Sequence, residues 1–403
     1  MKIMVQKFGG TSVATEDSRE HVYKKIEEAV RGGYSLVVVV SAMGRNGDPY
    51  ATDTLLNLIR KDIPFASKRE LDVIFSCGEN IAGAIVASNL QKRGYKSVYL
   101  TGEQARIITD ENFSDARIRR VETDKIKSLL DIGNIVVVGG GQGVSENGDI
   151  TTLGRGGSDT TGCALGVALH ANEIHIYTDV EGIMTADPRK VKEAVLLEKI
   201  SYEDCCNMAN KGAKVIHPRA VEIAMKNPES RLYVKSTFST NPGTLICEDD
   251  ENLEDVNTTG VAGQDNLVYC RVVSNEYKSY DKLQEIMGCP ALHDSKVYYG
   301  IDGIVFVSDS KIFAAAEKKF NDNGFKLIKC ENVSEVSIIG SNFMKYPELC
   351  QEIRDKIQKR GIDIKMCMEE DKSVSYVISE EHYICTMNLL HEFVVNKTAG
   401  IIN

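Results

Sequence analysis

Short apolar runs alternate with amphipathic segments over residues 1–247. The run from Leu36 to Val40, one leucine followed by four valines, is typical of a strand buried on both faces of a parallel sheet. Asp17 to Arg31 instead has its apolar residues at helical spacing. Further strands are expected at Ile3 to Phe8, Ser97 to Thr101, Ile135 to Val138 and Ile174 to Tyr177, and further helices around Asp53 to Leu58 and Ser67 to Leu90. This alternation predicts an α/β domain with a mostly parallel central sheet and helices on both faces.

The pattern changes at an acidic run that begins at Glu248. Such a run is typical of a solvated connection, so residues 248–257 are predicted to be a linker. Beyond it, strands are expected at Leu267 to Val273, Ile304 to Val307, Phe325 to Lys329, Val336 to Ile339, Ile362 to Met366 and Val374 to Ile378, and helices at Ile312 to Phe320, Leu349 to Gln358 and Tyr383 to Val394. Residues 258–403 are therefore predicted to form two small α+β units.

Composition and charge exclude several classes of function. The chain of 403 residues has a formal net charge of -10, which argues against a nucleic-acid partner because phosphate backbones need a basic face. The 11 cysteines include no Cys-x-x-Cys pair and the 7 histidines have no zinc spacing, so we expect reduced thiols and no metal site in the protein. The apolar runs are too short to span a membrane, and the chain enters its first strand without a signal-peptide pattern. These features predict a cytoplasmic location.

The first motif with chemical meaning is Lys7 to Ser12, KFGGTS, at the end of the first predicted strand. Two glycines there let backbone N–H groups approach an anion closely, because no Cβ is in the way. A lysine in front of them can neutralise charge on a phosphoryl group during its transfer. The order differs from that of a P-loop, in which the lysine follows the glycines. Taken alone, the pair of glycines is also compatible with a simple turn.

A second motif, GRGGSDTT from Gly154 to Thr161, predicts a glycine-rich loop that enters a helix, with Ser158 or Asp159 as the N-cap. An arginine among glycines has room to bind a carboxylate in bidentate fashion, which gives Arg155 a role in binding. Asp159 can orient the lysine of the first motif or contact a metal-bound phosphate.

A third segment, Tyr177 to Arg189, begins where a predicted strand ends, and this is where α/β sheets bind nucleotides. The dipeptide Asp187-Pro188 would also suit an ordinary turn. Lys214 is a second candidate for a phosphate contact, with an isolated surface lysine as the alternative. His217 is interpreted as structural.

Together these segments resemble the aspartokinases, which have the amino-acid kinase fold followed by paired ACT regulatory units. The matching segments are KFGGTS at Lys7 to Ser12, VVVVSAMG at Val37 to Gly44, SCGE at Ser76 to Glu79, TTLGRGGSDTT at Thr151 to Thr161, TDVEGIMTADPR at Thr178 to Arg189, GAKVIHPRAVEIA at Gly212 to Ala224, and PGTLI at Pro242 to Ile246. They cover nearly all of residues 1–247 in the family's order. The resemblance implies a kinase domain over residues 1–247 and a regulatory region over 258–403, in which one ACT-like unit (264–333) is inserted into the other (258–263 with 334–403).

The resemblance also implies roles for individual residues. Lys7 and Asp159 would be catalytic, with Asp159 anchoring Lys7. The amino-acid substrate would be bound by Ser41, Thr52, Glu79, Arg155, Gly156, Gly157 and Ser158, with Glu79 on its ammonium and Arg155 on its carboxylate. ATP would be bound by Lys7, Phe8, Gly9, Gly10, Thr178, Asp179, Met184, Asp187, Arg189 and Lys214.

The implied reaction is the phosphorylation of L-aspartate by ATP with Mg²⁺, the first step toward lysine, threonine and methionine. A carboxylate acceptor is already ionised at pH 7, so the absence of a histidine base is consistent with this chemistry. The reaction needs cations and N–H groups that reduce the repulsion between the carboxylate and the triphosphate.

Two departures from the family pattern bear on function. Where relatives commonly show Ala-Gly-Phe-Gln-Gly, this chain has Gly139 to Gly143 as GGGQG, so an aromatic position has become Gly141. We expect a looser loop there, at a cost of at most ~1 kcal/mol per extra glycine, with reduced affinity or altered substrate preference as a hypothesis. The effector loop expected in the first ACT unit is replaced by Val273 to Lys278. Feedback by lysine or threonine is still predicted, as is a homodimer formed through exposed ACT strands.

Two alternatives stay open. One is a kinase of the same fold that acts on another acidic substrate, such as glutamate or an N-acylated amino acid. Glu79 argues for a free ammonium group and against an acylated nitrogen. The other is a ligand sensor without catalysis, against which the presence of Lys7, Arg155 and Asp159 argues.

Overall fold

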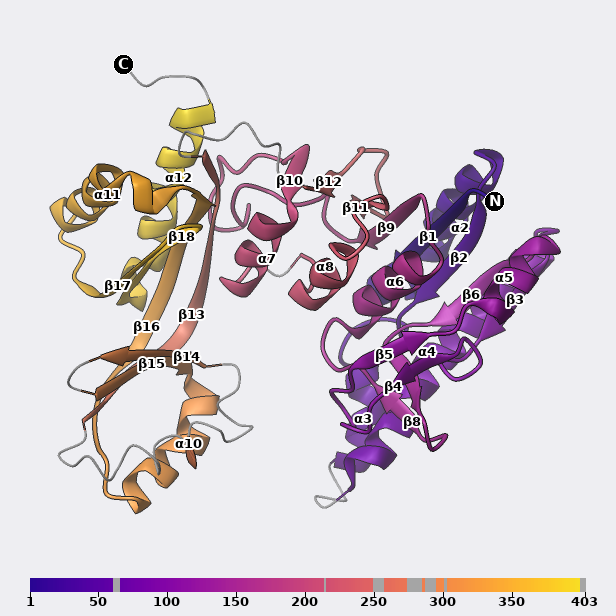
Figure 1. The fold of residues 1–403 in the computed structure, drawn as a ribbon, viewed down its shortest axis with the longest axis horizontal. Helices are drawn as coiled ribbons and strands as arrows, with labels where there is room; N and C mark the ends of the chain where they lie inside the picture. Colours follow the sequence, from indigo (N-terminus) through magenta and orange to yellow (C-terminus); the bar gives the residue numbers. More distant parts are fainter. Residues whose placement is uncertain are drawn as a thin grey trace. The chain divides into compact units, whose positions relative to one another are not determined.

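The computed structural model describes residues 1–60, 66–213, 215–248, 257–273, 285–286, 295–300 and 303–398. The described chain divides into two compact units. The first contains residues 1–184, 196–209 and 215–248, and the second contains 185–195, 210–213 and the described residues from 257 onward. Figure 1 shows the elements of both in sequence colours.

A central sheet of eight strands, counted over the described residues, forms the framework of the first unit. In spatial order they are β10 (Lys199–Ser201), β12 (Thr244–Cys247), β11 (Arg231–Ser236), β9 (Glu173–Thr178), β1 (Ile3–Phe8), β2 (Ser35–Val40), β6 (Ile135–Gly139) and β3 (Ser97–Leu100). Neighbouring strands run parallel except β11 and β12, which are antiparallel. The predicted mostly parallel sheet is confirmed.

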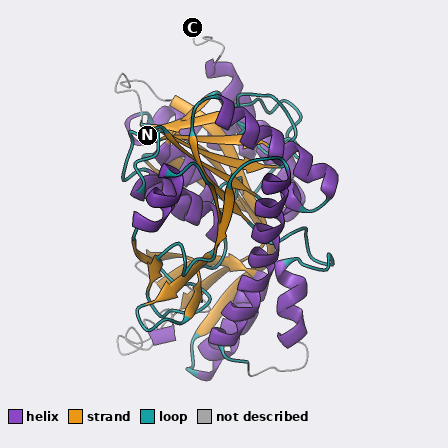
Figure 2. Ribbon diagram, turned by 90° about the vertical axis from the view of Figure 1, so that its right-hand side faces the viewer, coloured by secondary structure: helices purple, strands orange, loops and turns teal. Residues whose placement is uncertain are grey.

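Helices cover both faces of this sheet (Figure 2). The helices of the first unit are α1 (Gly10–Val13), α2 (Glu16–Arg31), α3 (Thr52–Arg60), α4 (Lys68–Lys92), α5 (Asp124–Asp131), α6 (Gly157–Ala168), α7 (Tyr202–Asn210) and α8 (Pro218–Ala224). Val38 of β2 belongs to a core that α2 and α4 complete, whereas the adjacent Val39 belongs to a core on the other face that α5 and α6 complete. Because successive strand residues face opposite sides, the four-valine run feeds both cores. Each fully buried valine stabilises the fold by roughly 1.5–3 kcal/mol.

Helix α4 is the one described helix long and apolar enough to cross a membrane by length and composition. Its residues Ala82, Val86 and Leu90 are fully buried in the core against the central sheet. The core helices of globular proteins also meet this criterion of length and composition. Here the apolar side of α4 packs inside the first unit.

A smaller four-stranded sheet lies in the same unit and was not predicted. Its order is β5 (Ile118–Val121), β4 (Ile107–Thr109), β7 (Gln142–Ser145) and β8 (Ile150–Thr152). These strands are only three or four residues long, too short for the alternation of apolar and polar residues to stand out in the sequence. Strand β8 leads directly into the glycine-rich loop.

The second unit is built on one antiparallel sheet. Its strands, in spatial order over the described residues, are β14 (Lys296–Gly300), β15 (Gly303–Asp309), β13 (Asn257–Val273), β16 (Lys326–Ser341), β18 (Ser373–Ser379) and β17 (Ile364–Glu370). Its helices are α10 (Ser310–Asp322), α11 (Pro347–Lys359) and α12 (Tyr383–Thr398), with short 3-10 turns at Phe343–Lys345 and Glu380–His382. Helix α10 packs on one half of the sheet and α11 with α12 on the other, and each half has its own core beneath these helices.

One detail of the sequence interpretation is wrong here. Phe325 to Lys329 and Val336 to Ile339 were expected to be two strands, but both lie in the single strand β16. Strand β13 likewise runs through Thr258–Gly263 and Leu267–Val273, with register shifts against β16 near Gln264. Polar residues such as Glu331 and Asn332 interrupt the apolar pattern inside β16, because only its second half is buried. The division at 263/264 and 333/334, and the linker at 248–257, remain a proposal; residues 249–256 lie outside the described residues.

Two segments from the predicted kinase domain, residues 185–195 and 210–213, fold into the second unit. The Thr185 hydroxyl lies 2.8 Å from Nε2 of His391 on α12, and the Val261 amide donates to the Thr185 carbonyl at 2.7 Å. Lys211 lies 3.7 Å from the carboxylate of Glu335, which is 1% exposed and also pairs with Lys296 at 2.7 Å. A buried carboxylate needs such partners, so these ion pairs hold the segment 210–213 on the sheet.

Candidate active site

A cavity of about 480 Å³ lies within the first unit, at the carboxyl ends of parallel strands. Ser41 follows β2, Gly140 follows β6, and Ser158 stands in the first turn of α6. The cavity is lined by Ser41, Thr52, Asp53, Leu56, Leu71, Asp72, Phe75, Glu79, Ser114, Gly140, Thr152, Gly154, Arg155, Gly156, Gly157 and Ser158. All the residues that the resemblance assigned to the amino-acid substrate are in this set, although they come from four separate stretches of the sequence.

Lys7 and Asp159 form an ion pair, with Lys7 Nζ 2.6 Å from Asp159 Oδ1. Their side chains are 10% and 13% exposed, so water screens the pair weakly. Helix α6 can lie this close to β1 because Gly162 faces Lys7: a Cβ on Gly162 would be only 3.2 Å from the Lys7 Cβ. The two glycine-rich motifs are thus brought together through one lysine and one aspartate.

Lys7 is followed by a turn that needs glycine. A Cβ on Gly10 would lie 2.6 Å from the Ala42 carbonyl oxygen and 2.8 Å from that of Gly44, so no larger residue fits without a backbone shift. Gly9 lies beside the Lys7 ammonium: a Cβ built on Gly9 would be 3.7 Å from Lys7 Nζ. Phe8 stacks on Tyr177 with 4.8 Å between the ring centroids, which ties the ends of β1 and β9 together. The predicted phosphate turn therefore lies at the end of the central strand, beside the lysine.

Glu79 is the buried acid of the cavity, with 2% of its surface exposed. The Ala42 amide donates to its Oε1 at 3.2 Å, while Oε2 is buried without a hydrogen-bond partner among the described residues. Burial raises the pKa of Glu79 to about 8, and hydrogen bonds from its own backbone, from the Ala42 amide and from the Thr52 side chain offset this effect only in part. An unpartnered buried oxygen that faces a cavity is suited to a cationic ligand such as an ammonium group.

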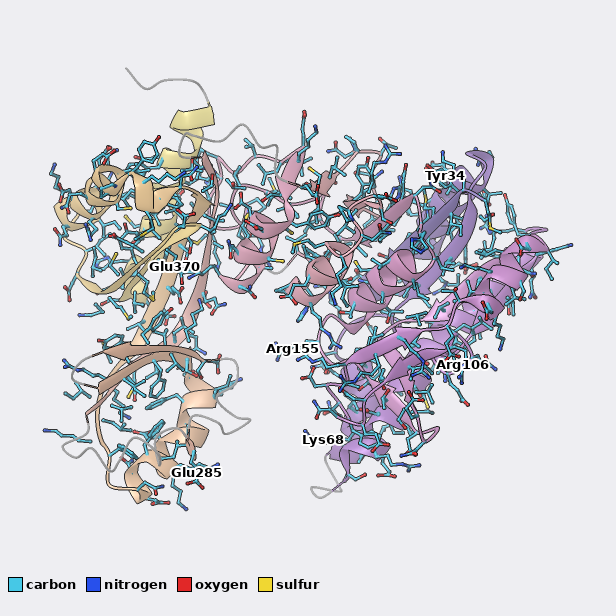
Figure 3. The ribbon with its side chains drawn as sticks, in the orientation of Figure 1. Tyr34, Lys68, Arg106, Arg155, Glu285 and Glu370 are labelled. Atoms are coloured by element: carbon cyan, nitrogen blue, oxygen red, sulfur yellow. The ribbon has the colours of Figure 1, made fainter. Side chains whose placement is uncertain are left out.

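Arg155 presents the opposite charge at the same cavity. Its side chain is exposed and extends outward from the ribbon (Figure 3), and it has no ion pair among the described residues. The loop that carries it enters α6 through Gly156, which has φ +64 and is the N-cap. The expectation of Ser158 or Asp159 at the N-cap is wrong, because both lie in the first helical turn and the left-handed conformation that starts the helix requires the glycine. The Ser158 hydroxyl instead accepts a hydrogen bond from the Ser41 hydroxyl at 2.9 Å.

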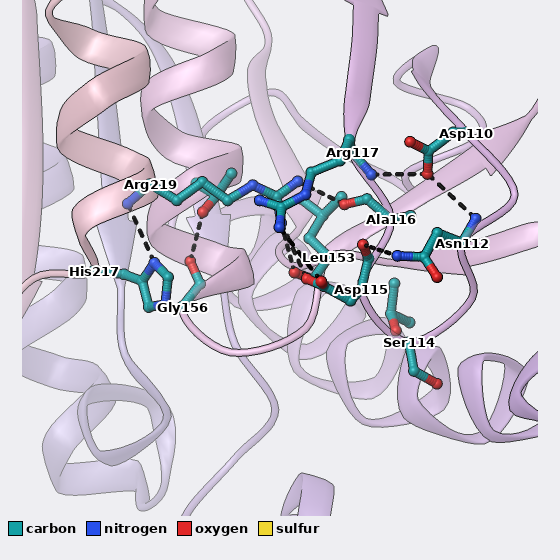
Figure 4. A network of polar contacts seen from close by, with 12 residues as sticks. Asp110, Asn112, Ser114, Asp115, Ala116, Arg117, Leu153, Gly156, His217 and Arg219 are labelled. Carbon is teal, nitrogen blue, oxygen red and sulfur yellow. Dashed lines mark hydrogen bonds and ion pairs between the residues drawn. The ribbon is translucent and has the colours of Figure 1, made fainter. Parts of the chain in front are cut away.

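A network of polar contacts holds this loop from behind (Figure 4). The Arg219 guanidinium donates to the carbonyls of Leu153 at 2.9 Å and Ala116 at 2.5 Å. Next to it, His217 caps α8: its Nδ1 accepts from the Arg219 amide at 3.3 Å, and its ring lies where a side chain on Gly156 would be. Burial lowers the pKa of His217, so the ring is neutral near pH 7. The structural interpretation of His217 agrees with these contacts.

Comparison with known proteins gives the family. The model of the amino acid kinase family matches residues 2–236. Aspartokinase 1 of Bacillus subtilis (strain 168) is 38% identical over 400 residues, which cover 97% of this chain and 98% of that one. The aspartokinase of Geobacillus stearothermophilus is 38% identical over 407 residues, with 97% of each chain covered. The chain belongs to the aspartokinases.

The whole fold agrees with this family. The structure of E. coli aspartokinase III in complex with aspartate and ADP superposes with a TM-score of 0.76 over 98% of this chain and all of that one; at 22% identity this likeness concerns the fold alone. The predicted fold class, an amino-acid kinase domain followed by an ACT-like regulatory region, is confirmed.

In this aspartokinase the predicted nucleotide residues fall into three groups. Thr178 and Asp179 lie at the end of β9, where Asp179 pairs with Arg45. Met184 follows and is bridged to Leu196. Asp187 and Arg189 belong to the second unit and pair with each other at 2.8 Å, an interaction that lowers the pKa of Asp187. Lys214 lies outside the described residues.

Asp72 and Phe75 are two cavity residues of this aspartokinase that were missed in the sequence. Asp72, 1% exposed, accepts hydrogen bonds from the backbone amides and hydroxyls of both Ser114 and Thr152. It thereby joins α4, β8 and the loop after β4 at the floor of the cavity. Phe75, on the same helix, forms part of the wall. Asp72, Phe75 and Glu79 lie three or four residues apart, the spacing of one helix face, so the position of Glu79 was the signal that could have identified them.

Proposed function

We propose that this aspartokinase transfers the γ-phosphoryl group of ATP to the side-chain carboxylate of L-aspartate and forms 4-phospho-L-aspartate and ADP. The observation that carries the proposal is the cavity, which a buried acid and an exposed guanidinium line together with Ser158, the chain neighbour of the Asp159 that pairs with Lys7. An amino acid needs an anionic partner for its ammonium and a bidentate cation for its carboxylate, and Glu79 and Arg155 are of those two kinds.

The reaction itself needs charge compensation more than proton transfer. A carboxylate oxygen of the substrate attacks the γ-phosphorus while the bond from that phosphorus to the β,γ-bridging oxygen breaks, and ADP leaves with the negative charge. Lys7, held by Asp159, provides a cation at the transferred group. Gly157 and Ser158, at the start of α6, line the cavity, so the positive end of the helix dipole acts there. No base is required, because the acceptor is already ionised at pH 7.

Magnesium enters this scheme as part of the nucleotide substrate. The described residues contain no group of three or more His, Cys, Asp or Glu side chains that could hold a metal ion. Mg²⁺ is commonly bound through substrate phosphates with few protein ligands, so we propose that it arrives bound to ATP. Thr178, Asp179, Met184, Asp187, Arg189 and Lys214 remain the proposed ATP contacts.

A coupled assay of ADP release tests the function directly. We expect turnover with L-aspartate, much weaker turnover with L-glutamate, and none with N-acetylglutamate, which has no ammonium for Glu79. Preferred turnover of glutamate would favour the alternative of a kinase for another acidic amino acid. No turnover with any of the three would favour the sensor.

The second unit suggests regulation and assembly. The fold is shared with E. coli aspartokinase III, which has also been solved with lysine and aspartate. We propose feedback by lysine or threonine, a homodimer and a cytoplasmic location for this chain. In the segment Val273 to Lys278, which replaces the expected effector loop, residues 274–278 lie outside the described residues. Unchanged activity in the presence of millimolar lysine, threonine or both would exclude feedback, and light scattering would give the oligomeric state.

A further inference from the structure

Gly141 was expected to loosen its loop, yet the loop around it is held by hydrogen bonds and close packing. The Gly141 amide donates to the Thr161 hydroxyl at 2.9 Å, and its carbonyl accepts from the Leu153 amide at 2.9 Å. A Cβ on Gly157 would be only 2.9 Å from the Gly141 Cα, so the loop lies directly against the start of α6. The expectation of a loosened loop is therefore not supported by these contacts.

The space beside Gly141 is occupied by another aromatic ring. A Cβ placed on Gly141 would lie 3.2 Å from Cζ and 3.3 Å from Cε1 of Phe75. These distances are shorter than the optimal separation of about 3.5–4.0 Å between carbon atoms, so a benzyl group could not be added at residue 141 while Phe75 keeps its position. Gly141 also has φ +71, a conformation that disfavours any side chain.

Phe75 approaches this point from inside the cavity. It lies on α4 one turn before Glu79, and the two line the cavity together with Leu71 one turn earlier. Residues four apart share a helix face, so the ring stands next to the buried carboxylate. Phe75 is partly exposed, whereas Glu79 is buried, which places the ring on the wall that a bound molecule would meet.

We propose that Phe75 is a specificity-determining residue that forms the apolar wall of the amino-acid pocket, in the space that the missing side chain of Gly141 leaves open. The inference rests on the proposed function, because it takes the ligand to be held by Glu79 and Arg155. The ring then packs against the methylene of L-aspartate and limits the length of the side chain that can reach the phosphoryl group.

Kinetics with two substrates test the wall. We expect Phe75→Ala to raise the KM for aspartate about tenfold and to lower the preference for aspartate over glutamate about tenfold, since one methylene in an apolar pocket is commonly worth 10-fold or more. The KM for ATP stays unchanged. Phe75→Leu, which keeps an apolar side chain on the helix, should show an intermediate effect and serves as the variant that folds if Phe75→Ala does not. Val73→Ala is the matched control, because Val73 is on the same helix, 38% exposed and outside the cavity lining.

A stability cycle tests the packing independently of turnover. Gly141→Ala should lower the Tm more in the presence of Phe75 than in the Phe75→Leu background, because only the first case contains the steric contact; the strain of the positive φ is common to both. An equal decrease in Tm in the two backgrounds would overturn the inference. The inference would also fail if the wild type is active and the Phe75 variants keep both its KM for aspartate and its preference for aspartate over glutamate. If the wild type releases no ADP with aspartate, but Gly141→Ala still lowers the Tm more in the presence of Phe75, the proposed function is refuted instead.

Discussion

The buried Glu79 carboxyl makes aspartate binding depend on pH. Burial raises its pKa to about 8, so at pH 7 only about one-tenth of the free enzyme has the ionised carboxylate that an ammonium group needs, and at pH 8 about one-half has it. Because apparent affinity scales with the competent fraction, the KM for aspartate should fall about fivefold from pH 7 to pH 8. The KM for ATP should not follow this change.

The same group affects folding stability, and the sign can be worked out. The folded-state pKa of Glu79 is raised above the ordinary value of 4.5, so its contribution to stability is greatest below pH 4.5 and is lost as the pH rises toward 8. Two and a half pH units between 4.5 and 7 correspond to about 3 kcal/mol. Glu79→Gln carries no charge at any pH, so at pH 7 it should be more stable than the wild type by a value of that order.

Three measurements check this reasoning. ADP-release assays between pH 6.5 and 8 should show the decrease in the aspartate KM for the wild type, and a high, pH-independent KM for Glu79→Gln. Calorimetry in buffers of different ionisation enthalpy should detect the release of close to one proton when aspartate binds at pH 7. Urea unfolding at pH 5 and pH 8 should show a stability gap between variant and wild type that widens with pH. A gap of the same size at both pH values, with an aspartate KM that does not change with pH, would refute a raised pKa at Glu79.

Three further substitutions test other parts of the site. Lys7→Met should lower kcat by about 10²–10³-fold in the ADP-release assay, because it removes the cation at the transferred phosphoryl group; a decrease smaller than tenfold would count against a catalytic role. Arg155→Ala should raise the KM for aspartate about 10- to 100-fold with little change in the KM for ATP. An equal increase in both KM values would contradict the assignment of Arg155 to the aspartate carboxylate. Arg219→Met should raise the aspartate KM about tenfold and lower the unfolding free energy by about 2–4 kcal/mol, since two buried carbonyls lose a charged donor. Its control, Arg117→Ala, changes an exposed arginine of the same network and should leave both quantities unchanged.

Much of the catalytic unit could be predicted because its signals are local. The valine run of β2 needs only its own residues to show that it is buried on both faces. The helix around Ser67 begins after that residue, whose side chain caps it. The short strands β4, β5, β7 and β8 could not be predicted in this way, because three or four residues contain at most two periods of the alternating pattern. In the second unit, the continuous β16 was divided in two because one half is exposed and the other buried.

The amino-acid sequence by itself determined which chemical groups are present and in which turns they occur: a lysine before two glycines, an arginine among three, and an acid on a helix. Only the tertiary structure decided what those groups can do. Glu79 has a raised pKa because the folded chain buries its carboxyl group, and the hydrogen bonds from Ala42 and Thr52 offset this only in part. Phe75 can reach the wall because a glycine lies opposite it on a different loop. Burial and contact arise from segments far apart in the chain, and the local pattern of residues carries no record of which distant segment will be the neighbour.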